Sequence, residues 1–201
     1  MKQIEITTRV LDDITVVDEK LTKLGFQAIR TFIINDLYLC PNLTGLTKLN
    51  IDKYLKQCVL LRQIETETEI INKITYKNKV FQNGVTLSEE KIDVEIDDTE
   101  KAKSLFQALN FQELIRVTNQ SVVYKKDNWE LAFQNVTGLG LLLEYEHDDD
   151  FTGQDEKTIL KTKHEMLQKV KALGIQITAD FDVKKARELV FKKLSNIDKN
   201  Y

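Results

Sequence analysis

Hydrophobic and polar residues alternate along much of the chain, in runs typical of half-buried β-strands. One face of residues 3–10 carries Ile4, Ile6, Thr8 and Val10, and the other carries Gln3, Glu5, Thr7 and Arg9. Further strand patterns occupy residues 28–40, 58–66, 70–77, 85–96, 113–125, 129–134 and 141–147. Because successive strand side chains point to opposite faces, these strands are predicted to have one apolar and one charged face.

Four segments instead show the apolar spacing of amphipathic helices: residues 13–24, 99–109, 155–173 and 183–194. Gly25 suits the position after the end of the first helix. This order of elements indicates an α+β fold with a largely antiparallel sheet. Charged faces on most strands predict that the sheet closes into a β-barrel with a charged lumen and helices packed outside. We expect one domain over residues 1–195 and a tail at 196–201.

Composition narrows the classes of function. The chain has 201 residues, 30% of them charged, and a net charge of −3. It therefore lacks the overall positive charge that attracts nucleic acid, and no nucleic-acid partner is expected. No apolar run is long enough to span a bilayer, so no membrane partner is expected. The two cysteines, Cys40 and Cys58, form no metal-ligand spacing and no evident disulfide framework, which fits a reduced cytoplasmic setting.

The most informative segment is residues 136–146, V-T-G-L-G-L-L-L-E-Y-E. It combines a Gly-x-Gly turn with an apolar strand that ends in Glu144 and Glu146. Two residues apart on a strand, these carboxylates share a face and repel each other unless a cation, a proton or water relieves them. One interpretation is a divalent-metal site with hard oxygen ligands; the other is a solvated strand edge.

With these motifs in order, the chain resembles the CYTH superfamily, the triphosphate tunnel metalloenzymes that include class IV adenylate cyclases, thiamine triphosphatases and inorganic triphosphatases. The resemblance covers residues 1–195. Residues 136–146 resemble the family's Gly-Leu-Gly turn and Glu-x-Glu strand, and I-T-Y-K at 74–77 resembles the strand that delivers a tunnel lysine. D-L-Y-L at 36–39 and D-V-E-I-D-D at 93–98 resemble two further family segments.

The chain also departs from the family pattern at several charged positions. The opening Glu-x-Glu-x-Lys motif reads here Glu5-Ile6-Thr7-Thr8-Arg9, so that one acid is lost and the lysine is an arginine. The Leu-Arg-x-Arg strand keeps only Arg62. Asn119-Gln120-Ser121 stands where the family has Lys-x-Arg, and Gln134 stands where it has an aspartate before the turn.

The resemblance implies a set of site residues. The implied catalytic residues are Glu5, Glu144 and Glu146, and the implied metal ligands are these three with Asp93 and Glu95. The implied phosphate-binding residues are Arg9, Arg62, Lys77 and Lys91. The cofactor would be Mg²⁺ or Mn²⁺, between which the sequence does not choose.

The implied activity is that of a divalent-metal-dependent, triphosphate-processing enzyme. It would either convert ATP to cyclic AMP and pyrophosphate or hydrolyse a triphosphate such as ATP, thiamine triphosphate or tripolyphosphate. The lost charges predict weakened activity. The alternative is a catalytically inactive tunnel-fold protein that binds a nucleotide or polyphosphate. A homodimer is left open.

Overall fold

The computed structural model describes residues 4–82, 85–147 and 149–197. Its strands are β1 (Glu5–Arg9), β2 (Gln27–Cys40), β3 (Val59–Glu65), β4 (Ile70–Gln82), β5 (Val85–Glu95), β6 (Gln112–Lys126), β7 (Trp129–Val136) and β8 (Gly140–Glu146). Its helices are α1 (Ile14–Lys23), α2 (Ile51–Leu55), α3 (Thr99–Ala108), α4 (Glu156–Lys171) and α5 (Lys185–Ile197). None of the described helices is both long and apolar enough to cross a membrane.

The strands predicted from alternation and the four predicted helices are confirmed, with ends that differ by a few residues. In β1 the predicted faces hold over the described residues, whereas Gln3 lies outside them. Gly25 ends α1 with φ of 85°, a left-handed conformation that glycine adopts at little cost. The short helix α2 was not predicted, because one turn and a half carries too few residues to show a period.

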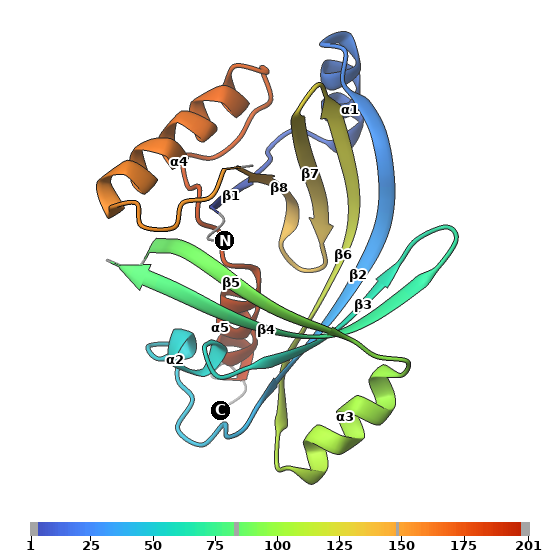
Figure 1. Ribbon diagram of the computed structural model, residues 1–201, viewed down its shortest axis with the longest axis vertical. Helices are drawn as coiled ribbons and strands as arrows, with labels where there is room; N and C mark the ends of the chain where they lie inside the picture. Colours follow the sequence, from blue (N-terminus) through green and yellow to red (C-terminus); the bar gives the residue numbers. More distant parts are fainter. Residues whose placement is uncertain (1–3, 83–84, 148, 198–201) are drawn as a thin grey trace.

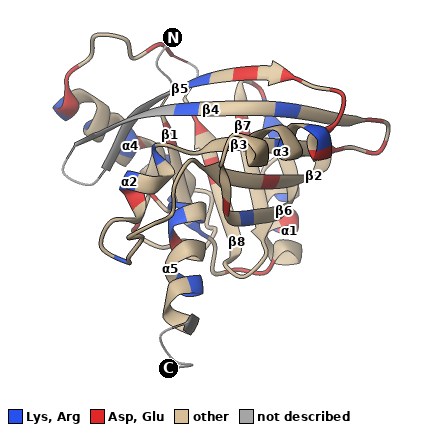
Figure 2. Ribbon diagram, turned by 90° about the horizontal axis from the view of Figure 1, so that it is seen from below, with Lys and Arg blue, Asp and Glu red and all other residues tan. Residues whose placement is uncertain are grey.

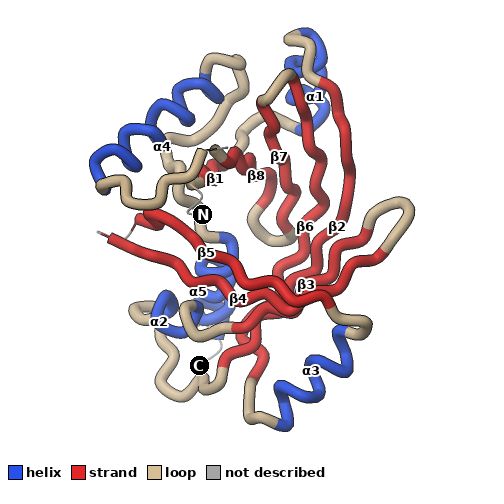
Figure 3. Tube along the Cα trace, in the orientation of Figure 1, coloured by secondary structure: helices blue, strands red, loops and turns tan. Residues whose placement is uncertain are grey.

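The eight strands form one antiparallel sheet in the order β1-β8-β7-β6-β2-β3-β4-β5. The predicted closed barrel is wrong, because the sheet is open and β1 and β5 are its two edges. The sheet curls strongly, and α4 lies between the two edge strands and contacts both (Figure 1, Figure 3).

The outer side of β1 is occupied by the segment before α5, which explains why β5 does not pair with it. Thr7 donates its backbone N–H to Phe181 O (2.9 Å) and accepts from Val183 N (3.0 Å). Arg9 O accepts from Thr178 N (3.0 Å). Because these backbone groups of β1 are already hydrogen-bonded, they are not available to pair with β5 and close the sheet.

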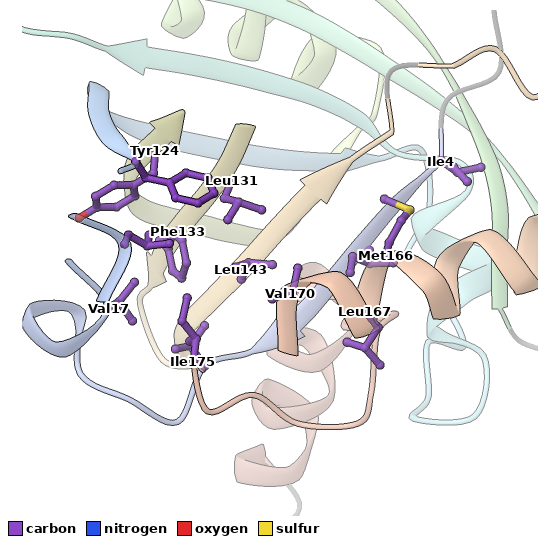
Figure 4. Close-up of a cluster of buried hydrophobic side chains, with 14 of the residues drawn as sticks. Ile4, Val17, Tyr124, Leu131, Phe133, Leu143, Met166, Leu167, Val170 and Ile175 are labelled. Carbon is purple, nitrogen blue, oxygen red and sulfur yellow. The ribbon is translucent and has the colours of Figure 1, made fainter. Parts of the chain in front are cut away.

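Helices cover different parts of the two faces of the curled sheet. On the outer face, α1 and α4 bury the largest hydrophobic cluster against β1, β7 and β8. Figure 4 shows Met166 and Val170 of α4 gathered with Leu143 of β8 in this cluster. On the inner face, α5 packs on Val117, Val136 and Leu142, so it fills one end of the concave side. The other end of the concave side is left for polar residues.

Candidate functional site

Charged residues from opposite parts of the sheet line a cavity of about 220 Å³ on the concave side. Its wall comprises Glu5, Arg30, Ile34, Arg62, Lys77, Lys91, Asn119, Val123, Glu130, Ala132, Gln134, Glu144, Glu146 and Lys185. Six of the residues predicted from the sequence are therefore brought together: Glu5, Arg62, Lys77, Lys91, Glu144 and Glu146. Their roles stay predictions, whereas their convergence is a property of the fold.

One wall of the cavity is acidic and is formed where β1 pairs with β8. Glu5 lies directly opposite Glu146 in the ladder, and Thr7 lies opposite Glu144. Thr7 is buried, so the family acid that it replaces would have stood beside Glu144. Like charges directly opposite each other on neighbouring strands destabilise the sheet. The Glu5–Glu146 pair thus favours a cation at this wall.

A second wall is basic and comes from β3, β4 and β5. Lys77 lies directly opposite Lys91 in the β4–β5 ladder, again a pairing of like charges. Basic positions are visible on both strands in Figure 2. Arg62 is held by two bonds to Asp36, Nε to Oδ1 at 2.7 Å and Nη2 to Oδ2 at 2.6 Å. Burial disfavours the charged form of Arg62, but the Asp36 carboxylate more than compensates and raises the pKa of this guanidinium.

Lys185, the first residue of α5, enters the cavity and binds Gln134 and Glu144. Its Nζ donates to Gln134 Oε1 (2.6 Å) and to Glu144 Oε1 (3.2 Å). Gln134 Nε2 in turn donates to Glu144 Oε2. Burial raises the pKa of Glu144, but the positive charges of Lys185, Lys77 and Lys91 outweigh it and lower that pKa to about 2. Glu144 is therefore a carboxylate at neutral pH.

Sequence reasoning missed Lys185 because nothing local distinguishes it. It follows Lys184 at the start of an amphipathic helix, a position where a lysine is usually solvated. Its role depends on α5 being directed into the concave side by the segment that pairs with β1. Arg30, on β2, is likewise a cavity residue that the sequence did not single out.

Three predicted site residues do not line the cavity. Arg9 pairs with Glu188 of α5 and donates to Leu139 O (3.4 Å). Asp93 accepts a hydrogen bond from Thr75 Oγ1 (2.7 Å). Glu95 is 79% exposed and lies 3.9 Å from the ammonium of Lys73. Their predicted phosphate and metal roles thus have no support from this geometry.

Two of the uncharged replacements, Asn119 and Gln134, line the cavity, and both are almost fully buried. Ser121 is also buried and donates its hydroxyl to Asn119 Oδ1 (2.7 Å). A neutral, hydrogen-bonded surface therefore occupies the part of the wall where the family pattern has charged side chains.

The carboxylates of the cavity fit a hard cation that takes only some of its ligands from the protein. They do not fit a metal site in which every ligand is a protein side chain. Among the described residues, no group of three or more His, Cys, Asp or Glu side chains is arranged to hold a metal ion. Glu5 and Glu146 supply carboxylate oxygens from adjacent strands, and Glu144 is bound to Lys185. Mg²⁺ is commonly held by one or two carboxylates together with water and substrate phosphates, which this pair of acids could provide.

The fold is shared with solved structures of low sequence identity. PH1819 protein of Pyrococcus horikoshii OT3 superimposes with a TM-score of 0.69 at 20% identity, covering 94% of this chain and 99% of that chain. A putative adenylate cyclase from Vibrio parahaemolyticus superimposes with a TM-score of 0.63 at 12% identity, covering 94% and 98%. At these identities the similarity establishes the fold alone.

Sequence comparison adds a closer relationship. No protein-family model matches the chain. The curated protein named putative adenylate cyclase MJ0240, from Methanocaldococcus jannaschii, is 30% identical over 175 residues, which cover 87% of this chain and 91% of that protein. With the motifs of β8 and β4 in place around one cavity, this relationship shows that the chain belongs to the CYTH superfamily.

Proposed function

We propose that this protein binds the triphosphate group of a nucleotide or a related compound in the cavity, together with a divalent metal ion. The observation that carries the proposal is the double pairing of like charges across neighbouring strands. Lys77 opposes Lys91 on one wall, and Glu5 opposes Glu146 on another. A metal–triphosphate complex presents phosphate oxygens to the lysines and a cation to the acids, and so relieves both repulsions at once.

The phosphate oxygens would be held by the convergent cations. Arg62 is oriented by Asp36, so its guanidinium loses little further freedom when it binds an anion. Lys185 is held by Gln134 and Glu144 in the same cavity. A triphosphate carries about four negative charges, and its binding needs several such cations. Each charge-assisted bond contributes about 1.5–3 kcal/mol.

The metal, Mg²⁺ or Mn²⁺, would be held by Glu5 and Glu146. Once bound, it would polarise a phosphoryl oxygen and neutralise developing charge. Glu144 would then position a cation and would not bind the metal. It holds the ammonium of Lys185 in the cavity, where this cation would bind a phosphate oxygen.

The favoured reaction is either cyclisation of ATP with release of pyrophosphate or hydrolysis of a triphosphate. The first follows the name of the archaeal relative. Both reactions use the same cations and carboxylates, and they differ in which phosphorus is attacked and by which oxygen. The residues of the cavity therefore support the class of reaction and leave the choice of substrate to experiment.

A second candidate function is binding without turnover. It is favoured by Asn119 and Gln134, two buried, uncharged side chains in the wall of the cavity. Catalysis suffers more than binding when cations are lost, because the charge on the phosphates must be stabilised in the transition state. This candidate predicts measurable triphosphate affinity with little or no product.

One experiment separates these functions. ATP, thiamine triphosphate and tripolyphosphate are titrated calorimetrically with Mg²⁺ or Mn²⁺, and products are identified after long incubation. Cyclic AMP indicates a cyclase, phosphate release indicates a hydrolase, and binding without product indicates the second candidate. Lys77→Met with Lys91→Met should abolish measurable binding, whereas the matched variant with Lys169→Met and Lys171→Met, two exposed residues near the end of α4, should not. Absence of binding by all three triphosphates contradicts the proposal.

A further inference from the structure

A second hollow lies on the outer face of the same strands that carry the candidate site. The long strands β2 and β6 are covered at one end by α1, and β2 is covered near its other end by α3 (Figure 1). Between these helices the outer face is left open, and a groove of about 710 Å³ runs there. The loop before α1 borders it, as does the turn between β3 and β4.

The floor of this groove is apolar. Ile33 of β2, Val122 of β6 and Phe133 of β7 contribute to it, with Leu141 of β8. These residues alternate with those of the cavity: Val123 and Gln134 are adjacent in sequence to Val122 and Phe133 and line the cavity on the other face. The floor of the groove thus lies on the opposite face from the candidate site, although five strands, β2, β3, β6, β7 and β8, contribute to both.

The borders of the groove are acidic on both sides. Asp12 and Asp13 lie on the side of α1, and Glu65 and Glu67 lie on the side of the β3–β4 turn. Among the described residues that line the groove, none is a lysine or an arginine. Its potential is therefore negative above an apolar floor.

These carboxylates differ in how far they are already engaged. Asp12 is held by Lys20 Nζ (2.7 Å) and by Gln176 N (2.9 Å), contacts that lower its pKa. Asp13 stands at the N-cap of α1, yet its side chain makes no capping hydrogen bond. Glu65 accepts one bond from the neutral Asn35 amide (3.1 Å), and no ion pair involves Asp13, Glu65 or Glu67 in the described part of the chain. In the described part of the chain, three of the four acids are thus outside any ion pair.

We infer that this groove binds a small organic cation with an apolar body, such as an aliphatic or aromatic amine. The apolar body would lie on Ile33 and Val122 and the ammonium would lie between the acidic borders. The volume is within the range of about 300–1,000 Å³ that is usual for sites of drug-sized ligands. A neutral ligand would use only the floor, and an anion would be repelled.

The test uses nuclear magnetic resonance on the full chain, with hexylamine and phenylethylamine as probes. Their neutral counterparts, hexanol and phenylethanol, and the anion hexanoate serve as matched ligands. The amines should shift the backbone amide signals of residues 31–33 and 120–122, with affinity that falls as salt is raised. The alcohols should bind about tenfold more weakly, because they lack the charge–charge interactions with the borders.

Two sets of variants sharpen the result. Combined Asp13→Asn, Glu65→Gln and Glu67→Gln should lower amine affinity about tenfold and leave the alcohols unaffected. The control replaces three exposed acids elsewhere, Glu19→Gln, Asp97→Asn and Asp127→Asn, and should retain amine binding. Equal binding of amines and alcohols, equal effects of the two variant sets, or shifts only at other residues would each overturn the inference. A basic peptide is titrated in the same way. If it shifts these amide signals and the amines do not, the inference is overturned in favour of a protein partner.

Discussion

Glu5 of β1 lies directly opposite Glu146 of β8, and both side chains line the same cavity. Two carboxylates in this relationship repel each other in the absence of a cation. The pair therefore couples the stability of the sheet to occupancy of the site. The first prediction concerns this coupling.

Replacement Glu5→Gln should stabilise the metal-free protein and weaken its affinity for Mg²⁺ and Mn²⁺. Removing one of two opposed like charges is expected to raise the free energy of unfolding by about 0.2–1 kcal/mol. Urea unfolding in a chelator measures the first effect, and calorimetry measures the second. Glu19→Gln, on the exposed face of α1, is the control and should change neither quantity. A destabilised Glu5→Gln protein with unchanged metal affinity would contradict the prediction.

The second prediction concerns the opposed lysines of β4 and β5. Lys91→Met should weaken binding of tripolyphosphate about tenfold to a hundredfold, because one charge-assisted contact of about 1.5–3 kcal/mol is lost. The same change should raise the pKa of Glu144, since the charge of Lys91 helps to lower it. Calorimetric titration measures the affinity, and a carboxylate titration followed by nuclear magnetic resonance measures the pKa. The idea fails if Lys91→Met binds tripolyphosphate as tightly as the unaltered protein does.

The third prediction follows from the lowered pKa of Glu144. Its value of about 2 lies below the ordinary value of 4.5, so between these pH values the unfolded chain takes up a proton before the folded protein does. The stability that this carboxylate contributes is complete above pH 4.5 and is lost as the pH falls towards 2. By the usual conversion this amounts to about 3 kcal/mol at most.

Glu144→Gln should therefore show a smaller loss of stability than the unaltered protein when the pH is lowered from 5 to 3. Unfolding by urea at several pH values measures the two slopes. Lys185→Met provides the complementary test, since removal of its ammonium should raise the pKa of Glu144 in a carboxylate titration followed by nuclear magnetic resonance. Parallel stability profiles for Glu144→Gln and the unaltered protein would count against this view.

The fourth prediction addresses the neutral wall. Asn119 lines the cavity, so Asn119→Lys would place a cation among the proposed phosphate ligands and should raise tripolyphosphate affinity about tenfold or more. Ser121→Arg should behave differently. Ser121 is buried and packed against Asn119, so the larger side chain is expected to destabilise the protein by about 1–3 kcal/mol. Calorimetry and urea unfolding distinguish the two effects, and equal affinities for Asn119→Lys and the unaltered chain would refute the assigned position.

Much of the candidate site could be predicted because strand periodicity fixes the face of each side chain. Glu144 and Glu146 share one face for the same reason that their neighbours Leu143 and Tyr145 lie on the other, where both pack in the largest hydrophobic cluster. Arg62 and Lys77 could be assigned to the charged face in the same way, and the resemblance of their segments to one family indicated that these faces meet. The cavity confirms this convergence.

The sequence by itself determined the strands, most of the helices and the division between apolar and charged faces, because these depend on residues close together in the chain. Only the tertiary structure decided that the sheet stays open, that Arg9 pairs with Glu188 and that Lys185 enters the cavity. All three depend on residues 177–183, which pair with β1 across more than 160 residues of chain and direct α5 into the concave side. Contacts over such separations leave no periodic trace in the sequence, since they arise from the competition of distant segments for the same backbone edge.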